Sequence, residues 1–260
     1  MIVVNKWSAV VLAGDRGPND PLLQATDVTC KAAVRFSGQT QLSRVIAALA
    51  QAEHIDHITI VGPDTDASKP HACIKELASQ YQFDYLAKAE GPSLSAIKGL
   101  EHRQNYPCLI ATCDVPFITS KAIDEYCEIA DSSSADFVVA AVPHQSIIKM
   151  LPTIRKTTYT FDQRLLCFSN LFAVRGSVGK EALHFWREME QKRKNPLQII
   201  AKLGVINLIK YKFGKITLKQ ASAYLSTLSA AEVEIILCDA PEISVDVDSV
   251  ADYELLKDYL

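Results

Sequence analysis

The sequence predicts an α/β fold with a largely parallel central sheet that helices cover on both faces. Several short apolar runs, rich in β-branched residues, are too short for helices and too continuously apolar for strands with one wet face. They are therefore typical of central strands. Segments with helical periodicity separate them, and this alternation favours parallel strands joined by crossover helices. The four clearest runs are 8–13, 58–62, 108–112 and 137–142.

Helices are expected between these strands. In the segment 40–52, apolar residues recur at spacings of three and four, which is the pattern of a helix with one buried stripe. Similar patterns occupy 70–81, 93–101 and 120–131. Ser120 is the expected N-cap of the last helix, because its hydroxyl can accept a hydrogen bond from a free backbone N–H of the first turn.

The second half of the chain continues the alternation after an irregular stretch or hairpin at 152–161. No repeat, linker or low-complexity stretch divides the chain. We therefore expect one domain, 1–260, with a helical insertion at about 176–230. Strands are expected at 166–174, 233–238 and 243–247, and helices at 180–194, 217–228 and 250–260.

Inside that insertion, the segment 196–214 is apolar with scattered lysines. Three interpretations stay open. The segment forms a helix pair over the active cleft, it forms a subunit interface in a homo-oligomer, or it docks another protein.

Composition limits the class of protein. Of the 260 residues, 48% are hydrophobic, which excludes a mainly disordered chain. The net charge of −3 argues against a nucleic-acid-binding surface. No apolar run is long enough to span a membrane, and the first residues lack the pattern of a secretory signal, so we expect a cytoplasmic protein.

Seven cysteines are scattered along the chain without a Cys-x-x-Cys pair. The simplest interpretation is reduced, buried thiols. A catalytic thiol is the alternative, and Cys113, at the end of an expected strand, is the one in a suitable place.

The first expected strand ends in a turn-forming loop at Leu12–Gly17. Ligands bind open α/β sheets at the carboxyl ends of strands. Small residues there let backbone N–H groups approach an anion, and Arg16 would add charge. The loop matches neither a P-loop nor a dinucleotide fingerprint. A plain surface turn is the alternative.

Three further positions carry charge at informative places. Lys31 follows the loop and is either a surface charge or a group that neutralises phosphate oxygens. Asp114 ends a buried strand, where it is either a metal ligand or a turn residue. Asp246 and Asp248 would share one face of a strand, which favours a cation between them, although Asp248 is also a candidate N-cap of the last helix.

The order of these motifs is more specific than any one of them. Leu12–Gly17, then Lys31, Cys113–Phe117 and the aspartates at 246–252 resemble the nucleotidyltransferases of the glycosyltransferase-A-like fold. The resemblance is strongest to the branch that includes the molybdenum-cofactor guanylyl- and cytidylyltransferases and the sugar-phosphate nucleotidyltransferases. The resemblance covers nearly the whole chain and implies a three-layer αβα fold with a mostly parallel, mixed and twisted sheet.

The resemblance also implies roles for the residues that match the motifs. The first loop would wrap the nucleotide, with Arg16 on the phosphates and Lys31 stabilising phosphate charge. Ser93 or Ser95 would help to hold the base, and Asn170 would contact the acceptor. Asp114 and Asp248 would hold Mg²⁺. The loop residues are Leu12, Ala13, Gly14, Asp15, Arg16 and Gly17.

The implied reaction is transfer of a nucleoside monophosphate from a nucleoside triphosphate to a small phosphorylated or hydroxylated acceptor, with release of pyrophosphate (a reaction of the EC 2.7.7 type). The sequence departs from the family at Asp15, where a second Gly is usual, at Pro18 and at Thr40. A carboxylate at Asp15 repels a triphosphate unless it points away or binds the metal.

Two other functions stay open on the same residues. One is a sugar transferase of the same fold that uses Asp246 and Asp248 as its metal motif. The other is a nucleotide sensor without catalysis, for which Asp15 is the best argument.

Overall fold

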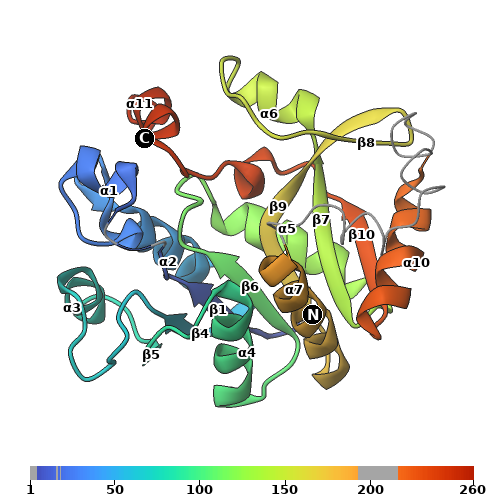
Figure 1. Cartoon of the computed structure of the whole chain (residues 1–260), viewed down its shortest axis with the longest axis horizontal. Coiled ribbons are helices and arrows are strands. Elements are labelled where there is room, and N and C mark those ends of the chain that lie inside the picture. The colour runs from blue at the N-terminus through green and yellow to red at the C-terminus, as the bar shows by residue number, and fades with distance from the viewer. Residues whose placement is uncertain (1–4, 16, 18, 193–215) are drawn as a thin grey trace.

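The computed structural model describes residues 5–15, 17, 19–192 and 216–260. Eight strands form one sheet in the order β10-β7-β9-β6-β1-β4-β5, with β8 paired to β9. Figure 1 shows this sheet running through the middle of the molecule. The strands are β1 (Trp7–Leu12), β4 (Ile55–Val61), β5 (Asp84–Leu86), β6 (Cys108–Thr112), β7 (Phe137–Pro143), β8 (Tyr159–Phe161), β9 (Arg164–Val174) and β10 (Val233–Leu237).

The sheet is mixed and mostly parallel, which confirms the predicted fold class. Strands β1, β4, β5 and β6 pair in parallel, and so do β7 and β10. Strand β9 lies antiparallel between β6 and β7. The parallel strands β6, β1 and β4 therefore end at one edge, so the loops that follow them meet there.

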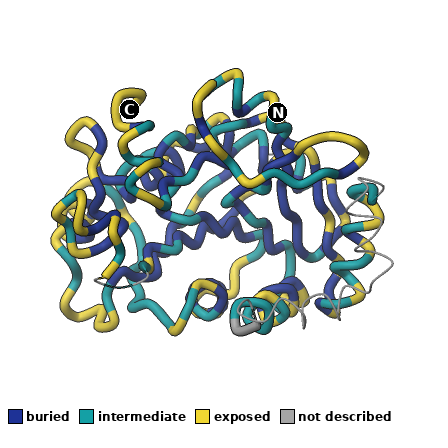
Figure 2. The backbone as a smooth tube through the Cα atoms, turned by 45° about the horizontal axis from the view of Figure 1, so that its top comes forward, coloured by how far each residue is buried: buried dark blue, intermediate teal, exposed yellow. Residues whose placement is uncertain are grey.

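Helices cover both faces, as the buried clusters show. On one face, Val11 of β1 packs in one cluster with α2, α3 and α5. On the other face, Val10 packs with α4 and α7. Figure 2 shows the buried strands between these two helical layers. The α-helices are α1 (Pro21–Thr26), α2 (Gln41–Gln51), α3 (Ala72–Ala78), α4 (Pro92–Arg103), α5 (Ser120–Asp131), α6 (His144–Met150), α7 (Lys180–Lys192), α10 (Leu218–Ser229) and α11 (Val250–Leu256).

Shorter elements connect these layers. A two-stranded hairpin precedes α2, and three 3₁₀ turns lie at the edges of the sheet. They are β2 (Arg35–Phe36), β3 (Gln39–Thr40), η1 (Lys31–Ala33), η2 (Ser177–Gly179) and η3 (Pro241–Ser244).

Two local predictions are wrong. The N-cap of α5 is Thr119, whose hydroxyl accepts from the Ala122 N–H, so Ser120 is already the first helical residue. The segment 243–247 is not a strand. It begins in η3. Its apolar residues Ile243, Val245 and Val247 are all fully buried in the core.

The end of the chain returns to the centre of the sheet. The Val247 N–H donates to the Asp114 carbonyl at 2.9 Å, which places the last loop beside the carboxyl end of β6. The single domain with a helical insertion stays a prediction, and the segment 196–214 lies outside the described residues. Among the helices that the structure describes, none is long and apolar enough to cross a membrane.

Gly99 sets the spacing between α4 and the sheet. A Cβ atom there would lie 2.5 Å from Val10 Cγ1 and 3.1 Å from Val61 Cγ2. We expect Gly99→Ala to lower the free energy of unfolding by about 1–3 kcal/mol, because a β-branched side chain on a central strand cannot move aside. Urea denaturation measures the loss. Gly176→Ala is the control, since nothing lies within 4 Å of its position. Equal stability of the two variants would contradict the close packing of α4.

Candidate active site

Lys31 is held in place by its backbone. It opens the 3₁₀ turn η1, and its residue is only 8% exposed. The fully buried Gln41, at the start of α2, donates from Nε2 to the Lys31 carbonyl at 3.0 Å. The backbone of Lys31 is therefore fixed, and this fixes the direction in which its side chain leaves the turn.

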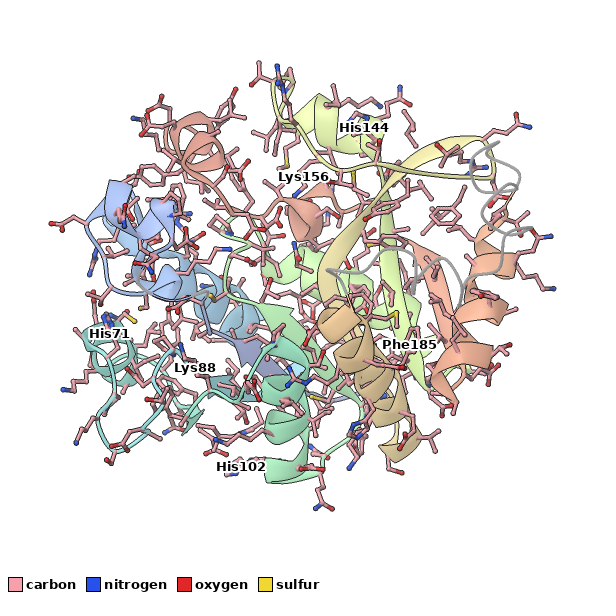
Figure 3. All side chains as sticks on the ribbon, viewed as in Figure 1. His71, Lys88, His102, His144, Lys156 and Phe185 are labelled. Atoms are coloured by element: carbon pink, nitrogen blue, oxygen red, sulfur yellow. The ribbon has the colours of Figure 1, made fainter. Side chains whose placement is uncertain are left out.

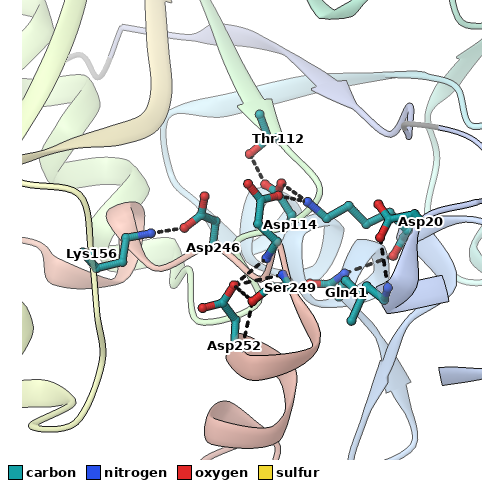
Figure 4. A network of polar contacts seen from close by, with 11 residues as sticks. Asp20, Gln41, Thr112, Asp114, Lys156, Asp246, Ser249 and Asp252 are labelled. Atoms are coloured by element: carbon teal, nitrogen blue, oxygen red, sulfur yellow. Dashed lines mark hydrogen bonds and ion pairs between the residues drawn. The ribbon is translucent and has the colours of Figure 1, made fainter. Parts of the chain in front are cut away.

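The ammonium of Lys31 joins two carboxylates from distant parts of the chain (Figure 4). Its Nζ lies 2.7 Å from Asp114 Oδ2 and also forms an ion pair with Asp248 Oδ1. The lysine and Asp114 are largely buried, whereas the side chain of Asp248 is 42% exposed. The predicted catalytic lysine and both predicted metal ligands thus lie at one point.

Each carboxylate has its own support. Asp114 follows β6, and Thr112 donates from its hydroxyl to Asp114 Oδ1 at 2.5 Å. Asp248 precedes the N-cap of α11, which is Ser249 rather than Asp248. Asp252 Oδ2 accepts from the backbone N–H of Asp248 and completes a capping box with Ser249.

The ion pairs decide the charge of the lysine. Burial is the largest single influence on the pKa of Lys31 and lowers it, but the carboxylates of Asp114 and Asp248 together outweigh burial. The pKa of Lys31 therefore lies above its ordinary value. Beside these carboxylates the group is a cation at neutral pH, suited to neutralise anionic charge and unsuited to act as a base.

A second lysine, which the sequence did not indicate, lies at the same carboxyl edge of the sheet. Lys156 comes from the loop before β8 and forms an ion pair with Asp246. Burial lowers the pKa of Lys156, although Asp252 and other nearby carboxylates act in the opposite direction. Sequence reasoning missed Lys156 because nothing in an irregular loop distinguishes a buried, paired lysine from an ordinary surface lysine.

The donor set at Asp114 and Asp248 fits Mg²⁺. Two carboxylates already converge on one cation, the Lys31 ammonium, which shows that their oxygens are close enough to share a charge. Carboxylate oxygen is the ligand type that Mg²⁺ prefers.

The carboxylate of Asp15 has partners within the chain. Its Oδ1 accepts from the Gly17 N–H at 3.0 Å and lies 3.4 Å from Lys88 Nζ. Its side chain is only 6% exposed. The predicted phosphate contact Arg16 lies outside the described residues. Lys88 was missed because it follows β5, a three-residue strand without a periodic pattern.

A cavity of about 300 Å³ lies beside this loop. It is lined by the loop Leu12–Gly17, by the loops that follow β4 and β5, by the segment before η1 and by the N-cap of α3. Its lining residues are Asp15, Gly17, Thr29, Cys30, Pro63, Asp64, His71 and Lys88.

The two predicted base-binding serines are both engaged within the chain. Ser93 donates its hydroxyl to Glu190 of α7 at 2.8 Å. Ser95 Oγ accepts from the Ala89 N–H at 3.0 Å. Helix α7 thus covers the first turn of α4, and a hydroxyl contact to a ligand at Ser93 requires exchange of its Glu190 partner.

Asn170 lies near the carboxylates along the sheet. Strand β9 pairs Leu171 with Ala111 of β6, so Asn170 is one residue beyond this pair, on the side of Thr112. Cys113, the candidate thiol, is buried, and burial raises its pKa, which argues against a nucleophilic role.

The family is shown by a comparison with protein-family models. The model of the MobA-like NTP transferase domain matches residues 9–200. The chain belongs to this family. It is accordingly a nucleotidyltransferase by family, and its sheet order matches the fold that the motifs predicted. No curated protein matches the chain.

Solved structures share this fold. A hypothetical transferase from Thermus thermophilus is similar with a TM-score of 0.79 and 24% identity, over 95% of this chain and 99% of that one. A 4-diphosphocytidyl-2C-methyl-D-erythritol synthase from Anaerococcus prevotii DSM 20548 gives 0.57 and 13%, over 98% and 96%. A CMP:2-keto-3-deoxy-manno-octonic acid synthetase complexed with CTP gives 0.56 and 11%, over 98% of each chain.

The cap of α11 is expected to control both stability and the position of Asp248. Ser249→Ala removes the side-chain half of the capping box and should cost about 0.5–2 kcal/mol of unfolding free energy. Ser249→Asn should keep most of the stability, because Asn is an equally good N-cap. Urea denaturation compares the two variants. If both were as stable as the parent, the capping box would not hold the last loop.

Proposed function

We propose that this NTP transferase transfers a nucleoside monophosphate from a nucleoside triphosphate to a small phosphorylated or hydroxylated acceptor. The observation that carries the proposal is the Lys31 ammonium between Asp114 and Asp248, at the carboxyl edge of the sheet. A cation beside two oxygen ligands matches the charge needs of a triphosphate with its metal.

The reaction needs little covalent chemistry from the protein. An oxygen of the acceptor attacks the α-phosphorus, the bond from this phosphorus to the bridging α–β oxygen breaks, and pyrophosphate leaves with the electron pair. The protein must align the acceptor with the leaving group and neutralise the charge that develops on the phosphate oxygens.

Lys31 is the residue that we assign to this neutralisation, with Arg16 as a second phosphate contact. The loop Leu12–Gly17 would lie along the nucleotide, and the cavity beside it has room for part of that ligand. Ser93 and Ser95 remain the proposed contacts to the base. Asn170 remains the proposed contact to the acceptor, on the basis of its place next to β6.

Asp114 and Asp248 are the proposed ligands of Mg²⁺, which when bound supplies positive charge to the phosphate oxygens. In the structure the ammonium of Lys31 balances these carboxylates. With Mg²⁺ held by Asp114 and Asp248, this ammonium would be available to phosphate oxygens. The same three side chains would therefore balance one another's charge without substrate and bind the triphosphate and its metal with substrate.

The proposal predicts which variants lose turnover. Lys31→Ala and Asp114→Asn should each lower the rate of pyrophosphate release by roughly 10²–10³, the range for loss of one electrostatic stabiliser. The assay uses each of the four common nucleoside triphosphates with Mg²⁺ and a panel of sugar phosphates and polyols. Lys219→Ala, an exposed lysine on α10, is the control. Unchanged pyrophosphate release from both site variants would overturn the mechanism, and a free nucleoside diphosphate as product would favour a sugar transferase.

The metal assignment predicts a separate effect on stability. Lys31→Met leaves the two carboxylates without their cation, so Mg²⁺ should stabilise this variant more than the parent chain. At a Mg²⁺ concentration ten times its dissociation constant, the gain is about 1.4 kcal/mol.

Thermal unfolding with and without Mg²⁺ measures this gain. The double variant Lys31→Met/Asp114→Asn is the matched control and should lose most of it. An equal response of the single and double variants would exclude Asp114 as a ligand.

A further inference from the structure

Two cysteines and a histidine meet beside the cavity that adjoins the loop Leu12–Gly17. Cys30 lies in the loop before η1, and His71 and Cys73 lie at the start of α3 (Figure 3 labels His71). The two sulfur atoms and a ring nitrogen all lie within 4.8 Å of one another. Both cysteines are free and buried. The proposed function assigns no role to these three side chains, although Cys30 and His71 line the cavity beside the nucleotide loop.

We propose that Cys30, His71 and Cys73 form a binding site for a thiophilic metal ion, with Zn²⁺ as the ion that fits best. In a tetrahedral zinc site with Zn–S bonds of 2.3 Å, two sulfur ligands lie about 3.8 Å apart. Movements of about 1 Å bring the three ligand atoms to such distances. Two thiolates and one neutral imidazole favour Zn²⁺ over Mg²⁺, because sulfur is a soft ligand.

A metal ion at Nδ1 of His71 would replace a hydrogen bond that this nitrogen accepts at the N-cap of α3. The Cys73 N–H donates to Nδ1 at 3.2 Å, so Nδ1 carries the lone pair and the proton of the neutral ring lies on Nε2. Nε2 lies 2.8 Å from the hydroxyl of Thr29. A metal-binding histidine commonly donates its other ring N–H to such a partner, which orients the ring. Nδ1 also faces the sulfur of Cys73 at 3.1 Å.

The thiols of Cys30 and Cys73 interact with each other. A hydrogen bond from Cys73 lowers the pKa of Cys30, and the same bond raises the pKa of Cys73. A bound metal ion would hold both sulfurs as thiolates. Its binding therefore releases protons and weakens as the pH falls.

The cavity offers the fourth ligand. Cys30 and His71 both line it, and so does the carboxylate of Asp64, which accepts from the His71 backbone N–H at 2.8 Å. A water molecule or an anion from the cavity can complete the tetrahedron, as in zinc sites with an open position. Because Cys30 precedes Lys31, the metal would tie the turn that carries the lysine to α3.

Metal binding by the full chain tests this proposal without nucleotide or turnover, so its failure and that of the proposed function are distinguishable. The reduced, metal-free protein is titrated with Co²⁺, followed by the thiolate-to-cobalt charge-transfer band, and then with Zn²⁺ as competitor. We expect one equivalent of Co²⁺ that Zn²⁺ displaces.

Variants assign the ligands. Cys73→Ala should abolish the band. His71→Asn keeps an N-cap for α3 but removes the imidazole, and it should weaken binding at least about 100-fold. Thr29→Val removes only the bond to Nε2 and should weaken binding about 10–100-fold. Cys127→Ala, in the buried face of α5, is the matched control and should bind like the parent.

Two outcomes would overturn the proposal. One is the absence of a charge-transfer band, or a band that survives in Cys73→Ala. The other is loss of two thiols on exposure to air without metal binding, abolished by Cys30→Ala or Cys73→Ala, which would identify the pair as a disulfide switch.

Discussion

The arrangement of the candidate site at the carboxyl edge of the sheet depends on one interaction, the ion pairs of the Lys31 ammonium with Asp114 and Asp248. The lysine lies 83 residues before one partner and 217 before the other. Two carboxylates placed together without a cation repel each other, so the ion triad explains why the last loop of the chain comes to the end of β6. The backbone bond from Val247 to Asp114 fixes the same approach. The start, middle and end of the chain therefore build one site.

Around this edge, opposite charges are paired in advance. Lys156 faces Asp246, and Lys88 faces Asp15, as Lys31 faces its two carboxylates. Under the proposed function, an anionic substrate would bind by exchange of partners. Such an exchange would keep each buried charge compensated, which avoids the cost of an isolated charge. This also resolves the difficulty posed by Asp15, whose carboxylate is turned inward to Gly17 and Lys88.

Sequence reasoning succeeded where the local pattern and the fold demand the same thing. The runs at β1, β4, β6 and β7 are buried on both faces, so their composition has only one good explanation. It failed where tertiary contacts decide. The segment 243–247 has the composition of a strand, yet it is buried without a partner strand. β5 is a half-buried strand of three residues, and the pattern around it gives no signal.

The sequence by itself determined the family, the αβα fold and the identity of Lys31, Asp114 and Asp248 as candidates, because ordered motifs at strand ends carry that information. Only the tertiary structure decided which charges meet. Lys156, Lys88 and the cluster of Cys30, His71 and Cys73 have no motif. Lys156, Lys88 and Cys30 meet partners many residues away, and these meetings follow from the sheet order and from the loops that it brings together.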